Sequence, residues 1–261
     1  MTLPSLIGMV HLQPLPGSPR YDGDLDRVLE AAGEDATVLV EAGFPGLLVE
    51  NFGDAPFFPG PVPPVTVATM TRAVEAVVSA SSVPVGVNVL RNDALAAVAI
   101  AAVTGASFIR VNVLSGTMFT DQGPITGQAA EVARLRAVLA PELKVLADVF
   151  VKHATPPAGL TIGQSAADLW ERGGADVLVV SGIGTGAEPS SEDVEKVRLA
   201  VPAAPIYLGS GVTTHNLPTL ATAANGAIVG TAAKFDGDPY RPVDPHRARE
   251  VVAAAAGAGW L

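Results

Sequence analysis

The sequence contains no cysteine among its 261 residues, which excludes disulfide bonds and thiolate chemistry. This composition is compatible with a reducing cytoplasm, where we expect the protein to be located. The first ten residues, MTLPSLIGMV, also lack the basic start and long apolar core of a signal peptide. We therefore expect no export.

The sequence also lacks a hydrophobic run long enough to span a membrane, although its mean hydropathy is positive, at +0.38. Its most apolar stretch, ALAAVAIAAV (Ala94–Val103), is far shorter than the roughly 20 residues that a spanning helix needs. This stretch has no polar stripe for water, unlike an ordinary outer helix. We expect it to lie in the subunit interface of a homo-oligomer that buries Leu95, Val98 and Ile100. The alternative is an alanine-rich composition without any interface.

Basic residues are scarce: 16 lysines and arginines stand against 26 acidic residues, and the formal net charge is -10. Binding of nucleic acid requires clustered basic side chains, so we expect no nucleic-acid partner. Small anionic ligands held by backbone amides stay compatible with this charge. The length and a hydrophobic content of 49% are sufficient for one large core, so we expect a single domain over residues 1–261.

Eight apolar stretches are present, and each ends on a polar, charged or glycine residue. Between them lie segments long enough for one helix each, which predicts an α/β protein with a single (β/α)8 TIM barrel. In such a barrel the catalytic groups lie where the strands end. The predicted strands are Ser5–His11, Gly46–Glu50, Val85–Asn88, Phe108–Asn112, Lys144–Asp148, Val177–Ser181, Ile206–Gly209 and Ala227–Gly230.

Polar residues at the strand ends are the candidate catalytic groups. Arg110 and Asn112 have the same parity on their strand, so their side chains point to the same side. A ring of such groups exceeds what packing requires, because unpaired charges are costly in a core. The alternative for any one of them is a structural ion pair, such as Arg110 with Glu50 or Asp148. The candidates are His11, Glu50, Asn88, Arg110, Asn112, Asp148, Lys152 and His153.

The chemistry of these residue types suggests roles without choosing among them. Asp148 or Glu50 can remove a proton, and His11 or His153 can donate one. Lys152 can stabilise an oxyanion or form a Schiff base. No cofactor is predicted. A divalent metal held by the two carboxylates and the two histidines is an alternative, although no local ligand motif supports it.

Glycine-rich turns follow the last three predicted strands: SGIGTG at Ser181–Gly186, GSG at Gly209–Gly211, and Gly230 with Thr231. Glycine lets backbone N–H groups converge on an anion, and barrel phosphate sites are frequently built after strands seven and eight. The alternative is a set of tight turns without a ligand. The candidate phosphate-binding residues are Ser181, Gly182, Gly184, Gly209, Ser210, Gly211, Gly230 and Thr231.

Two connections after strands are too long to be simple turns. NFGDAPFFPGPVPP (Asn51–Pro64) is stiff and apolar, and VLSGTMFTDQGPITG (Val113–Gly127) has glycine hinges. Both lie on the catalytic face, where long loops commonly cover a substrate. We expect them to act as lids through Asn51, Asp54 and Asp121. A purely structural role is the alternative.

Six segments that cover almost the whole chain carry a family resemblance. They are IGMVHLQPLPGSP (Ile7–Pro19), VENFGDAPF (Val49–Phe57), FIRVNVLSGTMFTDQGPITG (Phe108–Gly127), ADVFVKHA (Ala147–Ala154), VVSGIGTG (Val179–Gly186) and LGSGVTTHN (Leu208–Asn216). Together they resemble the BtpA/SgcQ family, and the first and third segments are distinctive.

The resemblance implies a barrel similar to the phosphate-binding ribulose-phosphate group. The family is named partly for a role in photosystem I biogenesis and partly for a protein associated with sugar catabolism. Its motif positions carry over without assigned roles. They are His11, Glu50, Asn51, Asp54, Arg110, Asn112, Asp121, Asp148, Lys152 and His153.

Two functional hypotheses follow. The first is an enzyme that acts on a small phosphorylated sugar or nucleoside-derived metabolite by acid/base chemistry, as a lyase or isomerase. The second is a non-catalytic assembly factor that binds a protein complex, as in photosystem I biogenesis. We favour the enzyme, because an assembly factor does not need a polar ring and a phosphate cradle together.

Overall fold

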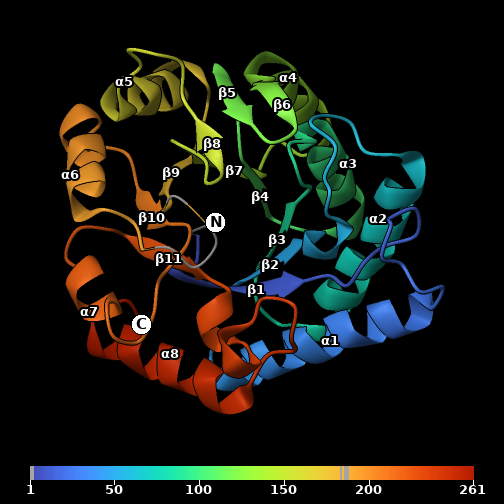
Figure 1. Ribbon diagram of the computed structural model, residues 1–261. Helices are drawn as coiled ribbons and strands as arrows, with labels where there is room; N and C mark the ends of the chain where they lie inside the picture. The colour runs from blue at the N-terminus through green and yellow to red at the C-terminus, as the bar shows by residue number, and fades with distance from the viewer. Residues whose placement is uncertain (1–2, 183, 185–187) are drawn as a thin grey trace.

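Eight parallel strands close into a barrel, as Figure 1 shows for the computed structural model, which describes residues 3–182, 184 and 188–261. The strand order around the barrel is β1-β11-β10-β9-β7-β4-β3-β2. The predicted TIM barrel is confirmed. The strands are β1 (Leu6–His11), β2 (Leu47–Glu50), β3 (Val85–Asn88), β4 (Phe108–Val111), β7 (Lys144–Asp148), β9 (Val177–Val180), β10 (Ile206–Leu208) and β11 (Gly226–Val229).

The outer helices follow the strands in sequence and are bounded by local signals. The side chain of Asp24 caps the first helix, and Gly43 ends it with a left-handed backbone at φ 101°. The side chain of Ser190 caps the sixth helix by accepting a hydrogen bond from the Asp193 backbone N–H. The helices are α1 (Leu25–Ala42), α2 (Pro64–Ala80), α3 (Ala94–Thr104), α4 (Ala129–Leu139), α5 (Ile162–Ala167), α6 (Ser191–Ala200), α7 (Leu217–Leu220) and α8 (Pro245–Gly257).

The barrel interior is filled by alternate strand residues, among them Met9, Leu48, Phe108 and Leu146. A larger apolar layer packs between the strands and the helices. Side chains two positions apart on a strand share a face, so the polar residues two positions after these core residues also point inward. These residues are His11, Glu50, Arg110 and Asp148.

The apolar helix α3 is covered by its own chain, between α2 and α4 (Figure 1). Val98 is 0% and Ile100 is 1% exposed, and Leu95 packs against the same core. The expectation that Val98 and Ile100 need a subunit interface is therefore wrong, because alanines let the neighbouring elements approach closely enough to bury them. Homo-oligomerisation itself stays a prediction. None of the helices in the described residues is long and apolar enough to cross a membrane.

The long connection after β4, for which we expected glycine hinges, contains regular structure. It folds into a hairpin of β5 (Thr117–Thr120) and β6 (Gly123–Thr126), and β8 (Ala154–Thr155) pairs with β5. Alternating side chains bury Met118 and Ile125 in a small cluster of their own. The resulting three-stranded sheet ties the connection after β4 to the connection after β7 (Figure 1).

Candidate active site

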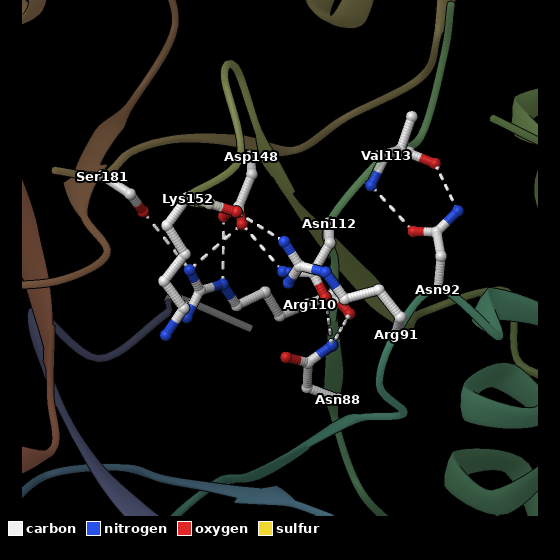
Figure 2. Close-up of polar contacts among 9 residues, drawn as sticks. All are labelled: Asn88, Arg91, Asn92, Arg110, Asn112, Val113, Asp148, Lys152 and Ser181. Atoms are coloured by element: carbon white, nitrogen blue, oxygen red, sulfur yellow. Dashed lines mark hydrogen bonds and ion pairs between the residues drawn. The ribbon is translucent and has the colours of Figure 1, made fainter. Parts of the chain in front are cut away.

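A buried ion pair lies at the base of the site. Arg110 Nε is 3.0 Å from Asp148 Oδ1, and Arg110 Nη2 is 3.1 Å from Asp148 Oδ2 (Figure 2). Both residues are 2% exposed. Burial lowers the pKa of Arg110, but the carboxylates of Asp148 and Glu50 and the hydrogen bond to Asp148 together outweigh this effect and hold that pKa above its ordinary value. Arg110 therefore stays charged.

Two asparagines and a serine hold this ion pair in place. Asn112 Nδ2 donates to Asp148 Oδ2 at 2.9 Å, and Asn88 Nδ2 donates to Asn112 Oδ1 at 3.2 Å. Arg110 Nη2 donates to Ser181 Oγ at 3.4 Å (Figure 2). Both oxygens of Asp148 are thus engaged by neighbouring side chains, so the geometry favours the structural alternative for Asp148, an ion pair with Arg110.

A small cavity of about 30 Å³ lies at the centre of the barrel mouth, and we call it the glycine cavity. Glu50 and Lys152 both face it. Among the described residues, the Glu50 carboxylate has no hydrogen bond, and the one basic side-chain nitrogen within 4.0 Å of it is His11 Nε2, at 3.9 Å. Lys152 Nζ has no ion pair in the same part of the chain. The lining residues are Met9, His11, Glu50, Arg110, Lys152, Gly209, Ser210, Gly211, Ile228, Gly230 and Thr231.

Among the charged side chains that line the glycine cavity, the cations Arg110 and Lys152 outnumber the one carboxylate, Glu50. Behind this lining, Asp148 pairs with Arg110, and Arg91 interacts with Asp148, Glu50 and Asp121. Burial lowers the pKa of Lys152 below its ordinary value; Arg110 and Arg91 lower it further, whereas Glu50 and Asp148 oppose the shift. A protein with a net charge of -10 therefore presents cationic groups where its strands end.

His11 is held as a neutral ring. Its Nδ1 lies 3.1 Å from the carbonyl oxygen of Pro239, which can only accept, so Nδ1 carries the proton and Nε2 faces Glu50. Burial, followed by the charge of Lys234, lowers the pKa of His11 from 6.5 to about 3. This environment disfavours the predicted role of His11 as a proton donor, because a neutral ring carries no second proton to give.

The turns after β10 and β11 supply one wall of the glycine cavity. A Cβ atom on Gly209 would lie 2.4 Å from Ser181 Oγ and 2.9 Å from Arg110 Nη2, so any larger residue would collide with the ion-pair network. Gly211 has φ +68°, a left-handed backbone that favours glycine. Five of the eight predicted phosphate residues line this cavity: Gly209, Ser210, Gly211, Gly230 and Thr231.

The turn after β9 does not line the glycine cavity in the described structure. Ser181 binds Arg110, and the Gly184 carbonyl accepts a hydrogen bond from Ser210 Oγ at 3.2 Å. Gly182 is buried. Residues 183 and 185–187 of the predicted SGIGTG turn and its continuation lie outside the described residues.

A larger cleft of about 350 Å³ adjoins the glycine cavity, and Lys152 lines both. We call it the aromatic cleft, because Phe52, Phe57 and Tyr240 form much of its wall. Of the predicted residues, the half-buried Lys152, the exposed His153 and the exposed Asp121 border it. The complete lining is Phe52, Ala55, Phe57, Leu90, Arg91, Asp121, Gln122, Lys152, His153 and Tyr240.

Asn51 and Asp54 connect neighbouring loops. Asn51 accepts from the Leu90 backbone N–H at 2.7 Å and donates to the Leu90 carbonyl at 3.3 Å. Asp54 accepts from the Leu15 backbone N–H at 2.8 Å and from Asn51 Nδ2 at 3.1 Å. Both contacts fix the base of the first long connection, so the geometry favours the structural alternative for these two residues.

The four side chains of the alternative metal set do not converge. In the described chain, no group of three or more histidines and carboxylates is close enough to hold a metal ion. Asp148 is engaged by Arg110, and His153 lies at the rim of the aromatic cleft.

Sequence reasoning missed Arg91 and the aromatic wall. Arg91 is 4% exposed and donates from Nη2 to the Lys152 carbonyl at 2.5 Å, which fixes the backbone of Lys152 (Figure 2). Arg91 could have been identified from the sequence, because it is a charged residue three positions after the end of β3. Tyr240 has no comparable signal, because it lies far beyond the end of β11.

Comparison with known proteins places this geometry in a family. The model of the BtpA family matches residues 2–257. The chain is 45% identical to the Photosystem I biogenesis protein BtpA of Synechocystis sp., over 96% of this chain and 88% of that protein. It is 50% identical to an uncharacterized protein of Thermococcus kodakarensis, over 96% of this chain and 94% of that protein.

Solved structures share the fold at low identity. Thiamine phosphate pyrophosphorylase from Pyrococcus furiosus is 15% identical, with a TM-score of 0.63 over 97% of this chain and 96% of its own. Phosphoribosyl anthranilate isomerase from Thermus thermophilus is 12% identical, with a TM-score of 0.58 over 97% and 98%. These likenesses show the barrel alone, whereas the family match and the close relatives show that the chain belongs to the BtpA family.

Proposed function

We propose that this protein is an enzyme that binds a small phosphorylated sugar or nucleoside-derived metabolite and acts on it by acid/base chemistry, as a lyase or isomerase. One observation carries the proposal: Glu50 and Lys152 face the same cavity as the glycine turns after β10 and β11. A base, a cation and an anion cradle at the end of the strands are the parts that such a reaction needs.

Several features support phosphate as the anchored group. The glycine cavity suits one compact group rather than a sugar ring, and its lining has two cations, Arg110 and Lys152, against one carboxylate, Glu50. Its turns follow the two strands that frequently build phosphate sites in barrels. Two proteins that share the fold are also named for phosphate compounds, thiamine phosphate and phosphoribosyl anthranilate.

The contacts of each side chain suggest its role in the proposed reaction. Glu50 is the preferred base, because its carboxylate faces the cavity without a hydrogen bond in the described residues. Lys152 stabilises developing negative charge or, with its lowered pKa, forms a Schiff base with a carbonyl substrate. Asp148, Asn88 and Asn112 hold Arg110 in place.

The test is turnover of a substrate found by a thermal-shift screen of phosphorylated metabolites. Glu50→Gln keeps the size of the side chain and removes the base, so turnover should fall by roughly 10²- to 10⁴-fold. Glu192→Gln on the exposed face of α6 is the matched control and should keep full activity. A folded Glu50→Gln variant with wild-type turnover would remove Glu50 from the mechanism.

A non-catalytic assembly factor is the second candidate. The observation that favours it is the name of the Synechocystis relative, a Photosystem I biogenesis protein. This candidate predicts binding of a protein complex that is unchanged in Glu50→Gln and Lys152→Met, with no metabolite turned over. Turnover that depends on these residues contradicts it.

A further inference from the structure

The aromatic cleft has a chemical character that a plain sugar phosphate does not use. Its wall is made of Phe52, Phe57 and Tyr240, together with Leu90. A small sugar offers little apolar surface to this wall, whereas the flat face of an aromatic ring would bury much more against it. The volume, about 350 Å³, lies within the range of small-molecule sites.

Contacts with residues outside the cleft fix the orientation of the aromatic side chains. Phe52 stacks on His11 with ring centroids 4.5 Å apart, and Tyr240 tilts against Phe52 at 5.1 Å. The guanidinium of Arg20 lies 5.1 Å from the centre of the Tyr240 ring. Tyr240 is nevertheless 57% exposed. A large ring that is fixed in orientation and exposed to solvent offers a preformed stacking surface.

The cleft also has a polar edge, at the turn of the β5–β6 hairpin. Gln122 Nε2 donates to Asp121 Oδ2 at 2.6 Å, and both residues line the cleft. Gln122 Oε1 is buried and has no hydrogen-bond partner in the described structure. Unpaired buried acceptors are uncommon. Because Gln122 lines the cleft, an N–H on the edge of a heterocyclic ring bound there would satisfy this oxygen once the side-chain amide turns toward it.

Lys152 connects the two sites, because it lines both the glycine cavity and the aromatic cleft. A single ligand can therefore place a phosphate in the first and a ring in the second. We infer that the substrate class is nucleotide-like: a phosphate ester of a sugar that carries a flat heterocyclic ring, with the ring against Tyr240 and Phe52. This inference rests on the proposed function for its phosphate end and on the cleft for its ring end.

Calorimetry with defined probes tests it. The probes are ribose 5-phosphate, the four common nucleoside 5′-monophosphates and their nucleosides. At least one monophosphate should bind about tenfold or more tightly than ribose 5-phosphate, since stacking one base on an aromatic residue is worth that much. Tyr240→Ala should remove this advantage and leave the affinity for ribose 5-phosphate unchanged.

Phe235→Ala is the matched control, because Phe235 is a partly exposed aromatic residue on the same connection that does not line the cleft. It should leave every affinity unchanged. Gln122→Ala should weaken the monophosphate but not ribose 5-phosphate, which keeps the inference testable if Tyr240→Ala fails to fold.

The outcomes separate the two proposals. If ribose 5-phosphate binds as tightly as every monophosphate, the ring inference is overturned and the phosphate site stands. If nucleosides bind in a Tyr240-dependent way but ribose 5-phosphate does not bind, the ring inference stands and the phosphate proposal fails. If no probe binds, both fail.

Discussion

At the scale of single residues, the Arg110–Asp148 pair decides how the site is built. Two buried charges in bidentate contact are stable together, but removing one strands the other in a medium that solvates it poorly. The pair also fixes Gly209, since a side chain there would strike Arg110 Nη2. The Arg110–Asp148 pair therefore fixes the shape of the glycine cavity.

The first prediction concerns this pair. Asp148→Asn should lower the free energy of unfolding by about 3 kcal/mol or more, because Arg110 loses its buried counter-charge. Denaturant unfolding measures it, and Asp26→Asn is the control. Asp26 pairs with Arg72 at 3.9 Å on the surface, where such contacts contribute about 0–1 kcal/mol. Equal stability of the two variants would show that Arg110 does not depend on Asp148.

The second prediction concerns His11 and pH. The pKa of His11 is about 3 in the folded protein and 6.5 ordinarily. Between these two pH values, His11 is protonated in the unfolded chain but not in the folded protein. The unfolding free energy should therefore fall as pH drops from about 6.5 to 3, by about 1.4 kcal/mol per pH unit from this residue. The contribution is complete above pH 6.5.

Comparison of the wild type with His11→Gln isolates this effect, because the other titrating groups are common to both. The difference in unfolding free energy between the two proteins should change with pH over that window and be constant above it. Parallel pH profiles from pH 4 to pH 8 would mean that His11 titrates normally in the folded state.

At the scale of elements, one buried carboxylate ties the connection between β11 and α8 to α1. Asp35 on α1 accepts from Lys234 Nζ at 2.5 Å and from the Val243 backbone N–H at 2.7 Å. Lys234 and Val243 also pair with each other as an isolated β-bridge. The segment between them carries Pro239, which binds His11, and Tyr240, which lines the aromatic cleft.

The third prediction follows. Asp35→Asn leaves the Lys234 ammonium buried without its counter-charge and should cost about 3–5 kcal/mol of stability in denaturant unfolding. Adding Lys234→Met removes the stranded charge and should recover more than half of the loss. Chymotrypsin should cleave after Tyr240 faster in Asp35→Asn than in the double variant. If the double variant is no more stable than the single one, the ammonium is not the source of the loss.

The positions of the barrel strands could be predicted from the sequence, but the contacts between strands could not. The apolar runs predicted all eight barrel strands to within a residue or two, because a strand buried on both faces needs a continuous apolar run. Parity predicted that Arg110 and Asn112 face the same side. Pairing across strands carries no such local signal: the sequence offers both Glu50 and Asp148 as partners of Arg110 and provides no means of choosing between them.

The small sheet was missed for a related reason. β8 is only two residues long, and it forms because the hairpin after β4 offers an edge beside it, a contact between segments about 35 residues apart. The role of Tyr240 in the cleft could not be predicted for the same reason, since its position depends on Asp35, which is far away in the chain. The strand ends are local properties, whereas the cleft is a property of the closed barrel.

At the scale of the whole molecule, the glycine cavity draws its lining from opposite sides of the barrel. Glu50 ends β2, Arg110 lies on β4, Lys152 follows β7, and Gly209 and Gly230 follow β10 and β11. An anion bound there would contact turns that are adjacent only while the barrel is closed. Its binding should therefore stabilise the barrel as a whole rather than a single loop.

The last prediction uses this coupling. At about 100 times its Kd, inorganic phosphate should add about 2.7 kcal/mol of stability, which for a chain of this size raises Tm by roughly 5–10 °C. Sodium chloride at the same ionic strength is the control, because a general salt effect would act equally in both. In Gly211→Val the strained turn at φ +68° should weaken phosphate binding and remove the shift. A folded Gly211→Val protein with the full shift in Tm would show that the anion binds elsewhere. If phosphate does not raise the Tm of the wild type, the glycine cavity is not a phosphate site, and the proposal that Glu50 and Lys152 act on a phosphorylated substrate loses its support.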